Sequence, residues 1–291
     1  MDTEPSSAVN ETPFILIFTD LDGTLLDHHT YGWEEAKPAL ALCKRLDIPI
    51  ILVSSKTGAE IKVLQKNLGL STPFISENGG GICCPDIGHH GLPSGAVPSG
   101  KGWRWSLGVS YDVLVNALGE IREELGWDLR GFSEMGPEEI VQRTGLDPEM
   151  SLLAAMREYD EPFIVLEPKE LDIALLYDAA KKKDLNITTG GRFYHIHGRI
   201  DKGASVTKLI SWYKGHQAHV VSIALGDSPN DFSMLKRVDQ PVLIRSSRHF
   251  PGIEKDIPGL QITENMGPDG WNRAVLDILG QKLKGGISRH V

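Results

Sequence analysis

Residues 14–27, FILIFTDLDGTLLD, place an acidic loop directly after a short apolar run. The length and composition of the run at residues 14–18 are typical of a buried strand. Asp20 and Asp22 follow it, and ligands of parallel α/β sheets bind beyond the carboxyl ends of the strands. We therefore expect these carboxylates, with Gly23 behind them, to form a loop around an anion or a metal. An ordinary strand-to-helix turn is the alternative.

Strands alternate with helices on both sides of this segment. Residues 48–53 (IPIILV) and 73–76 (PFIS) predict buried strands, and the apolar spacing of residues 57–68 predicts a helix between them. The same alternation returns late in the chain, with a helix expected at residues 202–212 and a strand at residues 220–225. This pattern predicts an α/β fold with a Rossmann-like parallel sheet covered by helices on both faces.

The middle of the chain has a different rhythm. Residues 79–102 are rich in Gly and Pro, and a run of helices and strands follows them, ending in a predicted hairpin. We interpret this region as an α+β cap inserted into the α/β core. The expected limits are residues 13–85 and 198–291 for the core, residues 86–197 for the cap, and residues 1–12 for a disordered tail. Aromatic residues of the predicted cap are expected to pack its interior: Trp103, Trp105, Trp127 and Phe132.

Composition excludes several classes of protein. The chain has 291 residues, of which 41% are hydrophobic, so it can bury the cores of about two domains. Its net charge of −9 offers no basic excess for nucleic acid or an anionic membrane. Its apolar stretches are too short to span a bilayer, and its start lacks the order of a signal peptide. Three cysteines, two of them adjacent, do not suggest a disulfide framework and favour a cytoplasmic location. Nothing points to an obligate protein partner.

Further polar residues follow predicted strands or open a helix. Asp227 ends the strand before GDSPND, and Asp231 lies four residues beyond it. Ser54 ends another strand, and Lys202 opens a helix. Each has an ordinary alternative, because Asn230 or Asp231 could cap a helix, Ser54 could form a turn, and Lys202 could be solvated.

Taken together, these residues predict an anion site assisted by a metal. Clustered carboxylates repel one another and usually need a cation, and hard oxygen ligands suit Mg²⁺. A metal, a lysine, a hydroxyl and backbone N–H groups would form a pocket that binds anions strongly. Phosphoryl transfer requires mainly this kind of positioning and charge stabilisation.

The order DxDGT, Ser, Lys and GDxxND resembles the haloacid dehalogenase-like phosphatases, in their Cof-like branch with a large α+β cap. The resemblance implies that Asp20 is the nucleophile and that Asp22 is the general acid/base. It implies that Ser54 holds a phosphoryl oxygen and that Lys202 offsets negative charge. It also implies a Mg²⁺ site, for which we expect Asp20, Asp22 through its backbone carbonyl, Asp227 and Asp231.

A narrower resemblance, resting on ENGGGI, GGRFYHI and GPDGWN, is to the mannosyl-3-phosphoglycerate phosphatases. It implies hydrolysis of mannosyl-3-phosphoglycerate to phosphate and mannosylglycerate, a compatible solute, through an aspartyl-phosphate. The substrate is then a small phosphorylated glycoside. The expected substrate contacts are Ser55, Lys56, Glu77, Asn78, Thr189, Gly190, Gly191, Arg192 and Asn230.

Physical alternatives remain for several of these contacts. Glu77 and Asn78 could serve a turn before a glycine, and Arg192 could be a solvated residue beside a hairpin turn. His195 and His197 alternate along a predicted strand and are expected to pack rather than to bind a metal. A hexose phosphate or a sucrose-phosphate-like ester is the alternative substrate. A phosphate-ligand binding protein without turnover is a third hypothesis, although no residue of the core motifs is replaced.

Overall fold

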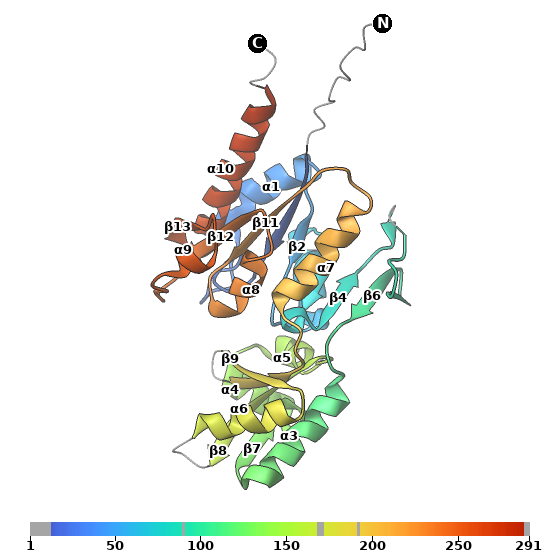
Figure 1. Ribbon diagram of the computed structural model, residues 1–291, viewed down its shortest axis with the longest axis vertical. Helices are drawn as coiled ribbons and strands as arrows, with labels where there is room; N and C mark the ends of the chain where they lie inside the picture. Colours follow the sequence, from blue (N-terminus) through green and yellow to red (C-terminus); the bar gives the residue numbers. More distant parts are fainter. Residues whose placement is uncertain (1–12, 89–90, 168–171, 191–192, 288–291) are drawn as a thin grey trace, which may run out of the picture.

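The computed structural model describes residues 13–88, 91–167, 172–190 and 193–287, and the predicted tail at residues 1–12 lies outside them (Figure 1). The core is a five-stranded parallel sheet in the order β13-β12-β11-β1-β2. Within the described ranges, no helix combines the length and hydropathy needed to cross a membrane. The strands are β1 (Phe14–Thr19), β2 (Ile50–Leu52), β11 (Val220–Gly226), β12 (Gln240–Arg245) and β13 (Gln261–Met266).

Alternate side chains of β1 pack into two separate hydrophobic clusters, one on each face of the sheet. Ile15 and Ile17 pack in the cluster that contains Trp271 of the closing helix. Leu16 and Phe18 pack in the cluster on the opposite face. Helices cover both faces, so the predicted α/β class is confirmed. They are α1 (Lys37–Arg45), α2 (Gly58–Leu68), α7 (Lys202–Lys214), α8 (Phe232–Leu235), α9 (Ile253–Asp256) and α10 (Gly267–Ile287).

A second sheet extends the core beyond β2, because Val53 forms a parallel bridge with Ile75. This sheet is antiparallel, in the order β3-β4-β6-β5. Its last strand pair brings Trp103 and Trp105 into the cluster that contains Leu209 of α7. The strands are β3 (Phe74–Ser76), β4 (Gly81–Cys84), β5 (Val97–Ser99) and β6 (Gly102–Ser106).

The two tryptophans therefore pack with the core, whereas the sequence placed them in the cap. The Gly- and Pro-rich stretch does not cross into the cap directly. It turns back to pair with β4, and the chain leaves the core sheets only after β6. This packing favours a first cap boundary near residue 107 rather than residue 86, and the domain limits stay a prediction.

The cap contains a third sheet, antiparallel and in the order β7-β8-β10-β9, and it lies below the core in the view of Figure 1. The longer cap helices α3 and α6 bury a cluster against this sheet. Phe132 packs against Phe193 in a smaller cluster, as expected for a packing residue. The cap elements are α3 (Tyr111–Leu125), β7 (Asp128–Gly131), α4 (Pro137–Thr144), α5 (Pro148–Ala154), β8 (Asp160–Glu167), α6 (Ile173–Lys182), β9 (Asn186–Gly190) and β10 (Phe193–His197).

Candidate active site

The expected site residues follow three adjacent strands of the core sheet. Asp20 and Asp22 come directly after β1, Ser54 follows β2, and Asp227 follows β11. Because β1 lies between β11 and β2, all four residues lie at the same edge of the sheet. The backbone N–H of Asp20 donates to the carbonyl of Leu225 at 2.9 Å, which ties the β1 loop to β11.

Lys202, the first residue of α7, lies between two carboxylates. Its Nζ is 2.7 Å from Oδ1 of Asp20 and 2.6 Å from Oδ1 of Asp231, and its side chain is 0% exposed. Burial alone would lower the pKa of Lys202, but the two negative charges raise it above its ordinary value. The two carboxylates therefore favour the charged form of Lys202 beside the expected nucleophile.

The carboxylates outnumber this cation. Asp20, Asp227 and Asp231 each offer an oxygen, and these oxygens lie within 4.8 Å of one another. Burial and the charge of Asp231 raise the pKa of Asp20, against the opposing effect of Lys202. Burial, with the charge of Asp231, raises the pKa of Asp227 to about 6. A second cation would relieve this repulsion, and three hard oxygens fit Mg²⁺.

Gly23 brings the β1 loop close to Asp227. Its φ is +81°, and a Cβ at this position would lie 2.9 Å from Oδ2 of Asp227. The next residue, Thr24, donates its hydroxyl to Oδ1 of Asp227 at 3.3 Å. A larger residue in place of the glycine would therefore displace one of the expected metal ligands.

Asp22 has a different environment from Asp20. Its Oδ2 lies 2.8 Å from Nζ of Lys56, and its side chain is 32% exposed. Its Oδ1 is buried and has no hydrogen-bond partner among the described residues. Burial would lower the pKa of Lys56, but the charge of Asp22 raises it on balance. One oxygen of Asp22 is thus held by a lysine, while the other is buried without a hydrogen-bond partner among the described residues.

Ser54 begins the loop that carries two further expected contacts, Ser55 and Lys56. Its hydroxyl is buried and accepts the backbone N–H of Lys56 at 3.2 Å. Its carbonyl accepts the N–H of Asn78 at 3.0 Å, and Nδ2 of Asn230 donates to Oδ1 of Asn78 at 3.2 Å. The structure therefore brings these five residues into one neighbourhood, and their contacts with a substrate stay a prediction.

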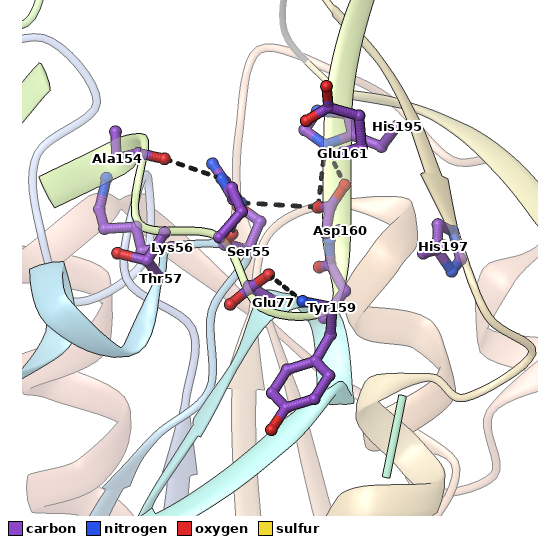
Figure 2. A network of polar contacts seen from close by, with 12 residues as sticks. Ser55, Lys56, Thr57, Glu77, Ala154, Tyr159, Asp160, Glu161, His195 and His197 are labelled. Carbon is purple, nitrogen blue, oxygen red and sulfur yellow. Dashed lines mark hydrogen bonds and ion pairs between the residues drawn. The ribbon is translucent and has the colours of Figure 1, made fainter. Parts of the chain in front are cut away.

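The carboxylate of Glu77 binds backbone N–H groups of the protein, and its expected contact with the substrate stays a prediction. Glu77 opens the short helix η2 (Glu77–Gly79) with a positive φ of 48° and is 2% exposed. Its carboxylate accepts the backbone N–H of Glu158 in the cap at 3.0 Å. It also accepts the backbone N–H of Tyr159 in the cap at 2.7 Å (Figure 2). Because these oxygens bind the cap, Glu77 forms a link between core and cap.

The cap hairpin is described only in part. Thr189 and Gly190 lie at the end of β9, where Thr189 is exposed, whereas Gly191 and Arg192 lie outside the described residues. His195 and His197, in β10, form protein hydrogen bonds with Asp160 and Thr188 respectively, which agrees with a packing role. Sequence reasoning missed Asp160 and its neighbour Arg157. The charged run REYDE before a predicted strand was the available signal.

Because Glu77 is buried, we expect its ionisation to make the stability of the folded protein depend on pH. Burial raises the pKa of Glu77 to about 7, against the opposing effects of Arg157 and the N–H of Tyr159. Since the folded pKa is the higher one, ionisation opposes folding, and stability falls as pH rises from about 4.5 to about 7. Glu77→Gln should remove this contribution, so relative to wild type it gains up to roughly 3 kcal/mol between pH 4.5 and pH 8. Urea unfolding across that range measures it.

The matched control is Glu35→Gln, which neutralises an exposed carboxylate. Its stability curve should run parallel to that of the wild type over the same pH range. A parallel curve for Glu77→Gln would mean that Glu77 ionises as easily in the folded chain as in the unfolded chain.

Residues 17–91 and 164–249 match the family of haloacid dehalogenase-like hydrolases. The chain belongs to this family. It is 41% identical to a glucosyl-3-phosphoglycerate/mannosyl-3-phosphoglycerate phosphatase of Methanococcoides burtonii, over 91% of this chain and 97% of the relative. It is 37% identical to a relative of the same name from Persephonella marina, over 93% of this chain and 99% of that one. The resemblance seen in the sequence motifs is confirmed.

The fold agrees with this membership. A solved haloacid dehalogenase-like hydrolase from Bacteroides thetaiotaomicron superposes with a TM-score of 0.63 and covers 91% of this chain and 99% of its own. At 18% identity, this likeness concerns the fold alone. The matched family ranges include Asp20, Ser54, Lys202 and Asp227, so the residues assembled at the sheet edge lie in the part of the chain that defines the family.

Proposed function

We propose that this enzyme is a Mg²⁺-dependent phosphatase that hydrolyses mannosyl-3-phosphoglycerate to mannosylglycerate and phosphate, with glucosyl-3-phosphoglycerate as a substrate of the same class. The observation that carries the proposal is the 41% and 37% identity to two phosphatases of that name over more than 90% of the chain. The proposed partner is a small phosphorylated glycoside. The three free cysteines are consistent with the proposed cytoplasmic location.

The environments of the two β1 carboxylates support their division of work. The Asp20 carboxylate attacks phosphorus, forming an O–P bond as the bond to the leaving oxygen breaks. Asp22, whose side chain is partly exposed, protonates that oxygen and then takes a proton from the water that hydrolyses the aspartyl-phosphate. Lys202 offsets charge on Asp20 throughout. When bound by Asp20, Asp227, Asp231 and the carbonyl of Asp22, Mg²⁺ would neutralise charge on the phosphoryl oxygens.

The glycosyl and glyceryl groups would lie between the core loops and the cap hairpin. Ser55, Lys56, Asn78 and Asn230 are the candidate contacts on the core side. Thr189 and Gly190, with Gly191 and Arg192 beyond the described residues, are the candidates on the cap side. An arginine there could bind the glycerate carboxylate through two parallel hydrogen bonds. These assignments explain why a charged glycoside would be preferred over a simple ester.

A substrate panel tests the proposal. Phosphate release is measured with Mg²⁺ for mannosyl-3-phosphoglycerate, glucosyl-3-phosphoglycerate, a hexose phosphate, sucrose phosphate and p-nitrophenyl phosphate. We expect kcat/KM for the glycosyl-3-phosphoglycerates to exceed the others by at least about 100-fold, as missing polar contacts predict. A higher value for a hexose phosphate or sucrose phosphate would replace the substrate. No turnover of any ester, with tight binding of one, would indicate a non-catalytic binding protein.

Metal binding should be visible without turnover. Adding Mg²⁺ to EDTA-treated protein should raise the melting temperature, because binding at 100 times the dissociation constant stabilises by about 2.7 kcal/mol. Asp227→Asn should abolish this rise, since it removes one carboxylate of the cluster. Asp112→Asn, which neutralises an exposed carboxylate in the cap, should retain it. An equal rise in the Asp227 variant would place the metal elsewhere.

A further inference from the structure

A buried network of polar side chains connects the core to strand β10 of the cap. On the core side it begins at residues 54–57, which we call the phosphate-site loop. The members of the network are Arg157, Asp160 and His195. Nη1 of Arg157 lies 3.6 Å from Oδ2 of Asp160, and Nδ1 of His195 lies 3.0 Å from the same oxygen. Figure 2 shows Asp160 beside His195, with Ser55 and Lys56 on the core side of the same network.

At its core end, this network contacts the phosphate-site loop, which begins with Ser54. Arg157 donates from Nη1 to the carbonyl of Ser55 at 2.9 Å. The hydroxyl of Thr57 donates to the carbonyl of Leu153, also in the cap, at 2.8 Å. On the other side, the carbonyl of Lys56 accepts the N–H of Glu77 at 3.0 Å. The loop is therefore held by the cap and by the core at once.

At its cap end, the network reaches the β9–β10 hairpin. At neutral pH an ionised carboxylate can accept hydrogen bonds but cannot donate them. Nδ1 of His195 therefore carries the hydrogen that it shares with Asp160. His195 is paired across the hairpin with Thr188, the residue before Thr189. The position of the proposed substrate contacts in the hairpin is thus linked to Asp160 through one strand pair.

Arg157 and Asp160 bring charges into this network, and charges are costly to bury. The side chain of Arg157 is 8% exposed and that of Asp160 is 1% exposed. Burial would raise the pKa of Asp160, but His195 and Arg157 lower it below its ordinary value. A buried ion pair adds little net stability compared with apolar packing, and its best-attested use is to select one geometry. Nε of Arg157 also donates to the carbonyl of Ala154 at 2.9 Å, so the guanidinium is fixed from three directions.

We propose that Arg157 is a positioning residue that couples the cap hairpin to the phosphate-site loop. A substrate that engages the hairpin then also fixes the loop of Ser54 for phosphoryl transfer, which favours glycosylated substrates over small phosphate esters. This inference rests on the proposed function for its kinetic consequences. The coupling itself, which is a link between two parts of the structure, does not require the substrate to be known.

A double-mutant cycle tests the coupling. Arg157→Lys keeps the charge but loses the planar fork, and His195→Leu removes the hydrogen bond to Asp160. Each should lower kcat for mannosyl-3-phosphoglycerate by about tenfold, and the double variant should be no slower than the slower single variant. His195→Asn should recover most of the rate, because its amide can donate where Nδ1 did. Hydrolysis of p-nitrophenyl phosphate by His195→Leu should change less than about threefold.

Multiplying effects in the double variant, or an equal loss for both substrates, would overturn the proposal, because either result describes independent or merely structural roles. Arg130→Lys is the control, since Arg130 forms a more exposed ion pair with Glu139 in the same cap. It should leave both rates unchanged.

Hydrogen exchange separates this inference from the proposed function. In His195→Leu, the amides of Lys56 and Asn78 should exchange faster, because both donate to Ser54. The control variant should not change them. If wild type hydrolysed no ester of the panel, the proposed function would fail while the exchange result still tested the coupling. Unchanged exchange at both amides in His195→Leu would overturn the coupling even in an active phosphatase.

Discussion

Replacing Asp20 by Asn should lower kcat by at least about 1,000-fold while the chain stays folded. An amide is a poor nucleophile for phosphorus, and none of the neighbouring carboxylates takes its place. Lys202 donates to Asp231, and Asp22 is paired with Lys56. Phosphate release under saturating substrate measures the loss, and acid-quenched wild-type enzyme should carry phosphate on the peptide that contains Asp20.

The melting temperature of Asp20→Asn shows whether its loss of activity comes from unfolding. The pKa of Asp20 is raised by burial and by the charge of Asp231, so the ionised carboxylate opposes folding. We therefore expect Asp20→Asn to melt no lower than wild type in the absence of metal. Asp112→Asn should keep both the wild-type rate and the wild-type melting temperature. A residual wild-type rate in Asp20→Asn would remove Asp20 from the reaction.

The sheet edge that carries the candidate site residues could be predicted because its signals are local. Each expected residue follows an apolar run of strand length, and parallel strands end at a common edge. The predicted strand before Asp20 is β1 (Phe14–Thr19), and the one before Asp227 is β11 (Val220–Gly226). Periodicity and turn chemistry need only a short window of sequence, so the α/β class of the core followed from a few such windows.

The contacts between core and cap could not be predicted in this way. Arg157 and Ser55 are 102 residues apart, and Glu77 is 82 residues from Tyr159. In the sequence, a charged residue before a strand is indistinguishable from a solvated one, because its buried partners come from other elements. The same reason explains Trp103, whose Gly- and Pro-rich surroundings suggested a domain crossing although long-range pairing with β4 places it in the core.

Replacing Lys202 by Met should destabilise the chain by about 3–5 kcal/mol, as is usual when one partner of a buried ion pair is removed. The lysine is the only cation within hydrogen-bond distance of Asp20 and Asp231 in the part of the chain that the structure describes. Its loss leaves a cluster of buried carboxylates unpaired. Urea unfolding in EDTA measures the change, and Lys214→Met, which removes an exposed charge from the same helix, should stay close to wild type.

Two further measurements identify the cause of this destabilisation. Mg²⁺ should raise the melting temperature of Lys202→Met more than that of wild type, because the cluster then lacks its other positive charge. The double variant Lys202→Met/Asp231→Asn should recover part of the lost stability, since it removes a buried negative charge together with its partner. If the double variant is as unstable as Lys202→Met, the loss comes from side-chain packing, and Lys202 does not stabilise the site through its charge.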